Sequence, residues 1–191
     1  MYSLIRQAII LLLFLTLLTG VLYPLALTVL AQALFPRQAN GSLITTADNR
    51  IIGSELIGQP FAESRYFWSR PSATASHPYN GAASIGSNWG PASAELAKMI
   101  QERAQYLRRA DPQNRAPIPV DLVTSSGSGL DPHISPAAAL YQLPRVAKAR
   151  GVDEQRLRRL ILSHVQGRTF GVLGEPVVSV VKLNIALDNL R

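Results

Sequence analysis

The 191-residue sequence contains no cysteine, which excludes disulfide bonds, thiolate metal sites and a cysteine nucleophile. Zinc fingers, iron–sulfur proteins and thiol proteases are therefore excluded as classes. The sequence also lacks any charged residue between Arg6 and Arg37, which leaves an uncharged window of 30 residues. Nearly all of the 19 basic and 12 acidic side chains lie after this window, and the formal net charge is +7.

Several catalytic motifs are absent as well. The sequence has no Gly-x-x-x-x-Gly-Lys-Ser/Thr loop, no Gly-x-Gly-x-x-Gly after an expected strand and no Gly-x-Ser-x-Gly elbow. The three histidines, at His77, His133 and His164, lack the i, i+4 spacing of a metal site on a helix. The sequence therefore predicts no catalytic nucleotide site and no metal.

The uncharged window is rich in leucine and predicts one transmembrane helix within residues 1–36, through Ala8, Leu18 and Leu30. A helix of 30 residues is about 45 Å long, and the hydrocarbon core of a bilayer needs only about 20 residues. Pro24 is compatible with this helix, because a kinked helix in lipid can re-satisfy the backbone groups that proline frees.

Two other interpretations of the window stay open. A cleaved secretory signal could use Ala31-Gln32-Ala33 as its cleavage site, although its apolar region is normally only about 7–15 residues long. A buried core helix is the second alternative, but such a helix would normally show polar residues at a regular period, and this window shows only scattered Thr and Gln.

Charge does not decide the orientation of the helix in the membrane, since Arg6 on one side nearly balances Arg37 and Arg50 on the other. A short tail before a large domain is typical of an uncleaved signal-anchor, which predicts a cytoplasmic N-terminus.

Residues 37–191 predict a single extracytoplasmic α+β domain with few strands, which is large enough to bury a core. Its basic residues are interleaved with acidic ones, so we expect a solvated or lipid-facing surface and no nucleic acid. Residues 42–46 and 50–53 predict a hairpin. Residues 59–91 are rich in Pro, Gly, Ser and Asn and predict a long irregular loop, of a kind that is often functional.

The first helix expected after this loop begins at Pro91 and ends before Asp111, with Arg103 on its outer face. Short strands are expected at residues 120–123 and 177–185, because both segments are rich in β-branched side chains.

Two further helices are expected. One begins at Ser135-Pro136, breaks into two pieces at Pro144 and ends at Gly151. The other runs from Asp153, as its N-cap, to Gly167. His164 lies on the apolar stripe of that second helix, so we expect it in the core or at its edge and not as a ligand.

A Ser/Gly loop, residues 124–129, precedes Asp131 and His133 and is the first candidate site. Ser126 or Ser128 could act as a nucleophile with His133 as its base, provided that the two side chains lie within hydrogen-bonding distance. The simpler interpretation is that Asp131 begins a turn and that the loop binds backbone.

An aromatic segment, Tyr66-Phe67-Trp68 followed by Arg70, is the second candidate site. It has three possible roles. It could pack in the core, form a partner-facing patch, since Tyr, Trp and Arg are enriched in binding hot spots, or anchor the domain at the membrane interface.

A set of stretches spread along the chain carries a specific resemblance to a known family: Asn40–Ile44, Gly53–Gln59, Tyr66–Ser72, Tyr79-Asn80, Gly86–Asn88, Gly90-Pro91, Val120-Asp121, Thr124–Pro136, Gln142, Pro144–Ala147, Arg168 and Leu173–Pro176. Together with the apolar N-terminal segment, they resemble the C subunit of the Kdp potassium-transporting P-type ATPase, the KdpC family. The resemblance covers nearly the whole chain in the same order.

The resemblance implies a non-catalytic accessory subunit of a complex that imports potassium at the cost of ATP. It implies a single span in the bacterial plasma (inner) membrane and a domain outside the cytoplasm. The implied partners are a channel-like potassium-binding subunit, a P-type ATP-hydrolysing subunit and a small single-span fourth subunit. Two roles are attached to the family, which are bracing the assembly and acting as a catalytic chaperone that raises the ATP affinity of the hydrolytic subunit.

The expected site residues follow from the residue patterns and from the family resemblance together. No catalytic residue, metal or directly bound cofactor is expected, since ATP and potassium act at the complex. Any direct contact with nucleotide is expected at Gln142 and Arg145. The residues expected to bind partners are Tyr66, Phe67, Trp68, Arg70, Thr124, Ser125, Ser126, Gly127, Ser128, Asp131, Pro132 and His133. The alternatives from other classes are a membrane-tethered extracytoplasmic serine hydrolase and a lone tethered binding module.

Overall fold

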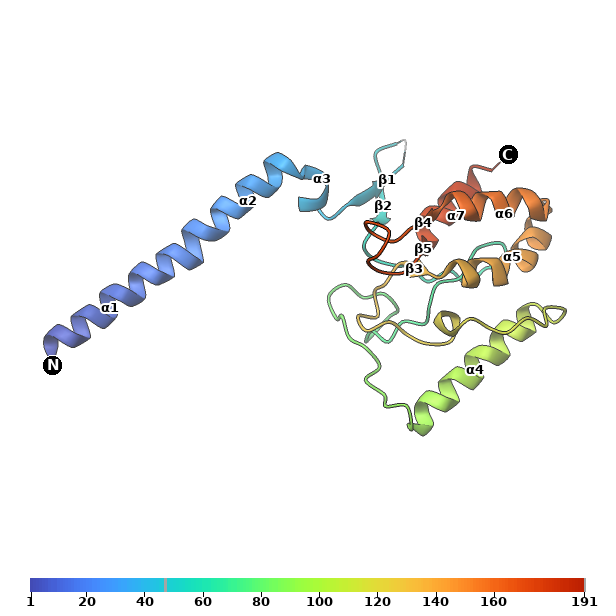
Figure 1. The fold of residues 1–191 in the computed structure, drawn as a ribbon, viewed down its shortest axis with the longest axis horizontal. Helices are drawn as coiled ribbons and strands as arrows, with labels where there is room; N and C mark the ends of the chain where they lie inside the picture. The colour runs from blue at the N-terminus through green and yellow to red at the C-terminus, as the bar shows by residue number, and fades with distance from the viewer. Residues whose placement is uncertain (47, 191) are drawn as a thin grey trace. The chain divides into compact units, whose positions relative to one another are not determined.

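The computed structural model describes residues 1–46 and 48–190, and it confirms the predicted mixture of helix and sheet with few strands. The chain divides into two compact units, Met1–Ser54 and Glu55–Arg191 (Figure 1). The domain boundary expected at residue 37 stays a prediction, and the last residue of that expected domain, Arg191, lies outside the described residues.

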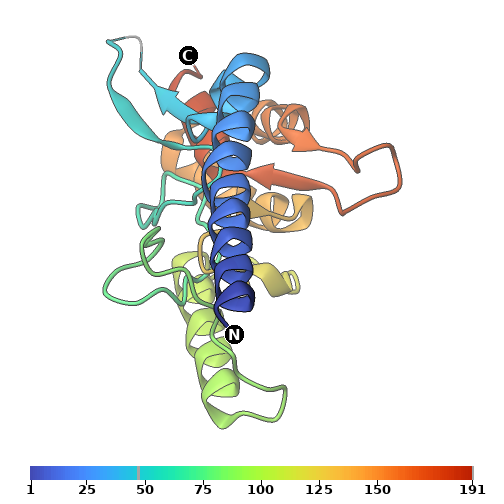
Figure 2. The same ribbon diagram turned by 90° about the vertical axis from the view of Figure 1, so that its left-hand side faces the viewer.

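The first unit is dominated by one long apolar helix. It is formed by α1 (Tyr2–Leu17), a π-helical turn η1 (Leu18–Leu22) and α2 (Tyr23–Leu34), which follow one another without a break (Figures 1 and 2). The whole helix, Tyr2–Leu34, has 33 residues and a mean hydropathy of 2.4 in its most apolar window, and no part of that window is buried within the chain. It is long and apolar enough to span a membrane.

The π turn lies directly before Pro24 and explains how the helix passes a proline. Proline has no N–H, and its ring crowds the preceding turn. In the wider turn, the N–H of Tyr23 reaches the carbonyl of Leu18, five residues earlier. One turn later, the hydroxyl of Thr28 donates to the carbonyl of Pro24 at 2.8 Å. The helix therefore continues through Pro24 to Leu34.

A short helix and the predicted hairpin complete this unit. α3 (Pro36–Ala39) follows the long helix, and β1 (Leu43–Thr45) then pairs antiparallel with β2 (Ile51–Ser54). The hydroxyl of Ser54 donates to the carbonyl of Gly41 at 2.7 Å and closes the base of the hairpin.

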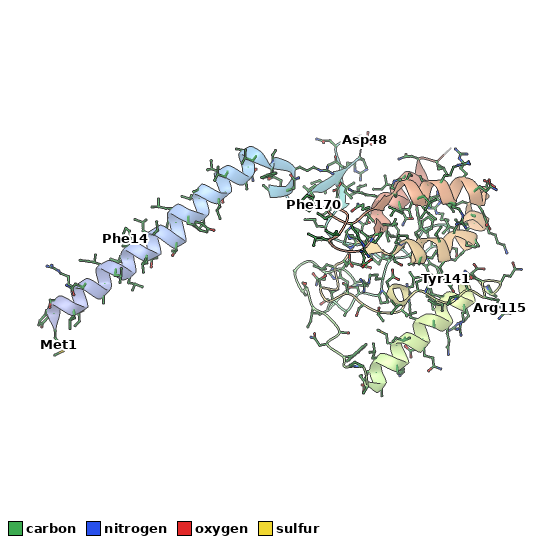
Figure 3. The ribbon with its side chains drawn as sticks, viewed as in Figure 1. Met1, Phe14, Asp48, Arg115, Tyr141 and Phe170 are labelled. Carbon is green, nitrogen blue, oxygen red and sulfur yellow. The ribbon has the colours of Figure 1, made fainter. Side chains whose placement is uncertain are left out.

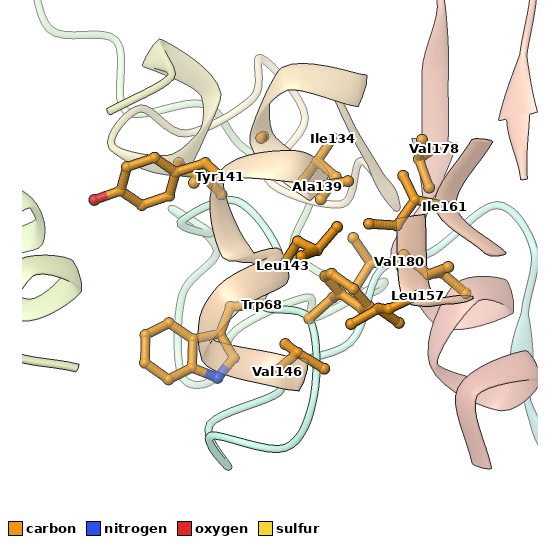
Figure 4. Packing of buried hydrophobic residues seen from close by; sticks show 14 of the residues in the cluster. Trp68, Ile134, Ala139, Tyr141, Leu143, Val146, Leu157, Ile161, Val178 and Val180 are labelled. Carbon is orange, nitrogen blue, oxygen red and sulfur yellow. The ribbon is translucent and has the colours of Figure 1, made fainter. Parts of the chain in front are cut away.

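The second unit is built on three helices packed against a small antiparallel sheet, whose strand order is β3-β5-β4. These helices and strands are α5 (Pro136–Arg150), α6 (Glu154–Ser163), α7 (Val180–Asp188), β3 (His133–Ile134), β4 (Val165–Gln166) and β5 (Val177–Ser179), and the unit also contains α4 (Ala94–Ala110) and the short turn η2 (Val120–Leu122), described below. Figure 4 shows Leu143 and Val146 of α5 near Leu157 of α6 and Val180 of α7, all of them buried. Each such side chain stabilises the fold by about 1.5–3 kcal/mol relative to an exposed one.

Helix α5 begins and ends as predicted. The hydroxyl of Ser135 accepts the N–H of Ala138 at 3.0 Å, and Pro136 occupies the first turn, where its missing N–H has no helical partner to lose. Gly151 ends the helix with φ of 63°, in the left-handed region that glycine adopts most easily.

The predicted break at Pro144 is wrong, since α5 runs through this residue without interruption. Pro144 is exposed, whereas Leu143 and Arg145 on either side are buried, so the helix is held by packing along its inner face. The carbonyl of Tyr141, one turn earlier, accepts a hydrogen bond from Asn114 Nδ2 at 2.9 Å. The single helical hydrogen bond that Pro144 removes is outweighed by this tertiary packing.

The strand predicted at residues 177–185 is wrong beyond Ser179, because α7 begins at Val180. Val180, Leu183, Asn184 and Leu187 are buried and recur at helical spacing. The β-branched run at residues 177–181 masked this period, since a short apolar run does not by itself separate strand from helix.

The strand predicted at residues 120–123 is also wrong. Val120–Leu122 forms η2, a single turn of 3₁₀ helix, in which Leu122 is fully buried and Val120 is exposed. In a strand these two side chains would share one face, so the observed burial is incompatible with an extended backbone.

Helix α4 (Ala94–Ala110) begins three residues later than predicted and ends before Asp111 as predicted. Its N-cap is Ser93, whose hydroxyl accepts the N–H of Leu96 at 3.3 Å, and Pro91 lies in the preceding turn. The placement of Arg103 on the outer face is wrong. Its guanidinium packs inward, donating to the carbonyl of Leu122 at 3.2 Å, and burial lowers its pKa.

Helix α6 is capped by Asp153 as predicted, since this carboxylate accepts the N–H of Arg156 at 2.9 Å. The predicted end at Gly167 is wrong. The helix ends at Ser163, and Val165 already pairs with Val178 in the sheet. His164 is half-buried at the end of the helix, which agrees with its predicted position at the edge of the core.

Candidate functional site

A cavity of about 400 Å³ brings together three of the residues that the sequence singled out, Arg70, Asp131 and His133. Arg70 follows the aromatic segment in the long loop, whereas Asp131 and His133 come from the turn that leads into β3. Its other lining residues are Pro119, Val120, Asp121, Ile134, Ser135, Ala137, Glu175, Pro176 and Val177. The long loop is confirmed as irregular, because no helix or strand lies between β2 and α4 among the described residues.

Asp131 contacts both of the other two residues, Arg70 and His133. Its Oδ2 lies 3.0 Å from Nη1 of Arg70, and its Oδ1 lies 3.1 Å from Nδ1 of His133 and accepts the N–H of His133 at 3.0 Å. Burial alone would raise the pKa of this carboxyl. The hydrogen bonds from His133 and the charge of Arg70 outweigh burial and hold the pKa of Asp131 below its ordinary value. Asp131 therefore stays ionised and joins two loops.

Asp121, which also lines the cavity, holds Ser135 in place. Its Oδ2 accepts the N–H of Ser135 at 2.6 Å, and its Oδ1 accepts the Ser135 hydroxyl at 3.1 Å. Because Ser135 in turn caps α5, this carboxylate fixes the start of the central helix. Among the described residues, no group of three or more His, Cys, Asp or Glu side chains is arranged to hold a metal ion.

The Ser/Gly loop packs closely against residues 72–86 of the long loop. The hydroxyl of Ser72 donates to the carbonyl of Gly129 at 2.7 Å, and that of Ser84 donates to the carbonyl of Ser128 at 3.0 Å. A side chain at Gly129 would lie only 2.7 Å from the carbonyl oxygen of Ile85, and its φ is +68°. Glycine is required here by both space and backbone conformation.

The two serines proposed as nucleophiles bind backbone instead. The hydroxyl of Ser126 accepts the N–H of Gly129 at 2.9 Å, and that of Ser128 accepts the N–H of Leu130 at 3.2 Å. Within residues 1–46 and 48–190, no hydrogen bond joins either serine to His133. The geometry thus supports the simpler interpretation of this loop, as a segment that binds backbone.

Two core residues of the aromatic segment, Phe67 and Trp68, are held by a pair of buried amides. Asn184 accepts the N–H of Phe67 at 2.9 Å and donates to its carbonyl at 3.0 Å. Gln142 accepts the N–H of Trp68 at 2.7 Å and donates to its carbonyl at 3.1 Å. Each amide acts as a neighbouring strand would, so an irregular segment crosses the core with its backbone groups satisfied.

Arg145 lies beneath Trp68 and is 7% exposed. Its guanidinium carbon is 3.8 Å from the centre of the Trp68 ring. Its nitrogens donate to the carbonyls of Ser64 and Tyr66 and, at 2.7 Å, to Oε1 of Gln142. Burial lowers the pKa of Arg145 to about 10, so the side chain stays charged at neutral pH. The cation binds the aromatic segment to α5.

Comparison with known proteins decides the family. Residues 5–189 match the family model described as KdpC, the K⁺-transporting ATPase c chain. The chain belongs to this family. A relative from Methylococcus capsulatus is 60% identical over 97% of both chains, and one from Sorangium cellulosum is 57% identical over 98% of both. One from Herpetosiphon aurantiacus is 54% identical over all of this chain and 98% of its own. Each is named a potassium-transporting ATPase KdpC subunit.

In this member of the KdpC family, the expected partner-binding residues fall into two groups. In the aromatic segment, Phe67 and Trp68 are buried, so their position favours core packing over a partner-facing surface. Tyr66 is half-buried, and its hydroxyl donates to Oδ2 of Asp188 at 3.1 Å. Thr124 to Ser128, Arg70, Asp131 and His133 are exposed or half-buried around the Ser/Gly loop and the cavity, and Pro132 is buried there. Their role in binding a partner stays a prediction.

Gln142 and Arg145 are both buried, and all the described hydrogen bonds of their side chains go to each other or to residues 64–68. Nucleotide binding at these residues stays a prediction, and their burial in the core does not support it.

Sequence reasoning missed Tyr79, which positions Arg70. The Tyr79 hydroxyl donates to the carbonyl of Arg70 at 2.6 Å, and burial raises its pKa. Its φ of +59° is unusual for a tyrosine. Tyr79 entered the sequence analysis only as part of the family resemblance, because no local pattern indicates a contact nine residues away.

Proposed function

We propose that this chain is a non-catalytic accessory subunit that assembles and stabilises a potassium-transporting ATPase. The observation that carries the proposal is the KdpC match over residues 5–189, which includes both the apolar helix and the second unit. The site supports it, because its charged side chains are occupied in joining loops and not in presenting a nucleophile.

The proposed partners are a channel-like potassium-binding subunit, a P-type ATP-hydrolysing subunit and a small single-span fourth subunit. The helix Tyr2–Leu34 has no buried window within the chain, so its apolar surface is free to pack against lipid and against other spans. In a bilayer such association depends on close packing and interhelical hydrogen bonds, and Gly20 offers a small surface in mid-span.

The proposed location is the bacterial plasma (inner) membrane, with the N-terminus in the cytoplasm and the second unit outside. The absence of cysteine gives a direct test. In the intact complex, a single Ala92→Cys variant should react with a membrane-impermeant thiol reagent in whole cells, because Ala92 is exposed. A matched Ser3→Cys variant should react only after lysis. The reverse labelling pattern would place the domain in the cytoplasm.

The catalytic-chaperone role is proposed to act through the assembly. ATP is cytosolic, so a domain outside the cytoplasm changes ATP affinity only as a coupling free energy transmitted by the complex, typically about 1–3 kcal/mol. The burial of Gln142 and Arg145 is consistent with this indirect route.

His133→Ala separates this proposal from a membrane-tethered serine hydrolase that uses the Asp131–His133 pair. We expect potassium-stimulated ATP hydrolysis by the complex to stay within about 3-fold of wild type. The unfolding free energy should fall by about 1–2 kcal/mol, because a hydrogen bond to an ionised carboxylate is lost.

The matched control is His77→Ala, since His77 is exposed. Hydrolysis of a generic p-nitrophenyl ester by the wild-type complex, abolished by His133→Ala and kept by His77→Ala, would support the hydrolase instead.

A further inference from the structure

The turn between β4 and β5 carries three large apolar side chains that the second unit leaves in solvent. Phe170 is 89% exposed, Val172 71% and Leu173 60%, and we call these three residues the apolar tip. Figure 2 shows this turn projecting from the sheet, and Figure 3 labels Phe170 on it. Isolated exposed apolar residues are common, whereas apolar residues that gather on one part of the surface are typical of a contact site.

The turn that carries the apolar tip has a defined conformation. Thr169 and Leu173 exchange two backbone hydrogen bonds of 2.8 and 3.0 Å. Gly171 and Gly174 have φ of 76° and 79°, as glycine allows, whereas Phe170 has φ of 55°. A phenylalanine in this region is uncommon and costs about 1 kcal/mol or more. The turn therefore keeps a fixed backbone conformation at Phe170, while the side chain of Phe170 stays exposed.

An ion pair closes the base of the turn. Nη2 of Arg168 lies 2.9 and 2.8 Å from the two carboxylate oxygens of Glu175. Glu175 also lines the cavity that holds Arg70, Asp131 and His133. Glu175 therefore belongs both to the base of this turn and to the lining of the cavity.

We propose that the apolar tip docks into a concave apolar pocket on another protein subunit of the same ATPase, with the Arg168–Glu175 pair at the rim. This inference rests on the proposed function and adds the residues of one contact. A projecting aromatic side chain that fills a pocket, surrounded by polar residues, is the usual anatomy of a binding hot spot.

The charge at the turn favours a protein pocket over a lipid surface. Binding to a membrane surface combines apolar side chains with a cluster of Lys or Arg that attracts anionic lipid. Here the one basic side chain of the turn is neutralised by Glu175, and residues 169–174 carry no charge.

The first test uses the full chain co-expressed with the other subunits of its ATPase. Phe170→Asn combined with Leu173→Gln removes the two largest side chains of the apolar tip and keeps the turn, since Asn tolerates positive φ. We expect about a tenfold or greater loss of co-purification in mild detergent, with the Tm of the variant chain unchanged. Leu162→Gln, at an exposed leucine on α6, is the matched control and should co-purify as wild type does. Wild-type co-purification of the double variant would overturn the proposal.

The second test locates the occupant directly. A Phe170→Cys variant offers the chain's single thiol, to which a short photoactivatable crosslinker is attached in the assembled complex. The proposal expects a crosslink to another subunit. Crosslinks only to lipid or only to a second copy of this chain would overturn it.

The two proposals fail in distinguishable ways. If the wild-type chain itself does not co-purify with the other subunits, the proposed function fails. If the wild type and the Phe170→Asn/Leu173→Gln variant co-purify equally, only the docking contact fails.

Discussion

Deleting residues 1–36 is expected to abolish potassium transport and assembly while leaving the second unit folded. The described core lies entirely between Phe61 and Leu190, and the long helix buries no part of its apolar window within the chain. All residues of that core therefore lie outside the deleted segment. Tethering to a shared membrane raises the effective concentration of partners, and its loss lowers apparent affinity by about 10²- to 10⁴-fold.

The measurements for this deletion are growth at low potassium, co-purification with the other subunits, and the Tm of the released fragment by circular dichroism. A chain in which an unrelated single span replaces residues 1–36 is the control that keeps the tether. Poor assembly of this control would show that the native helix makes specific contacts. Full transport by the deletion itself would contradict the proposed role of the helix.

Replacing Arg145 with alanine is expected to lower the unfolding free energy by about 2–4 kcal/mol. The substitution removes three hydrogen bonds from a charged donor and the stacking of its guanidinium on Trp68. It also leaves the carbonyls of Ser64 and Tyr66 without these donors. For a domain of this size the Tm should fall by roughly 6–14 °C. Thermal unfolding of the full chain in detergent, followed by circular dichroism, provides the measurement.

Arg145→Lys should recover only a small part of this loss. A lysine keeps the charge, but it lacks the planar fork that reaches several acceptors at once. Arg159→Ala, at an exposed position on α6, is the control and should change stability by less than about 0.5 kcal/mol. An unchanged Tm in Arg145→Ala would show that the buried cation contributes nothing net to stability.

Local sequence specified the two ends of α5 and the start of α6 correctly, whereas the end predicted at Gly167 was wrong. Ser135, Gly151 and Asp153 act through their own side chains or backbone on residues three or four positions away, so a short pattern contains the whole signal. The segments at residues 120–123 and 177–185 were predicted wrongly, because their conformation depends on which side chains the distant helices bury.

The candidate site was only partly predictable for the same reason. The composition near Asp131 and His133 indicated a turn, and the structure adds that Arg70, 61 residues earlier, completes it. The inward orientation of Arg103 and Arg145 was harder to predict, since arginine is normally exposed. Their inward orientation depends on Trp68 and on backbone carbonyls from other segments, which no spacing along the chain reveals.

The pairing of Phe67 with Asn184 determines when this domain can fold. The two residues are 117 positions apart, and their hydrogen bonds cannot form until Asn184 has been synthesised. Contacts of such large sequence separation also slow folding. During synthesis, the backbone groups of Phe67 therefore lack these hydrogen bonds until α7 has emerged from the ribosome. A truncated product that ends before α7 lacks the Asn184 side chain that satisfies them.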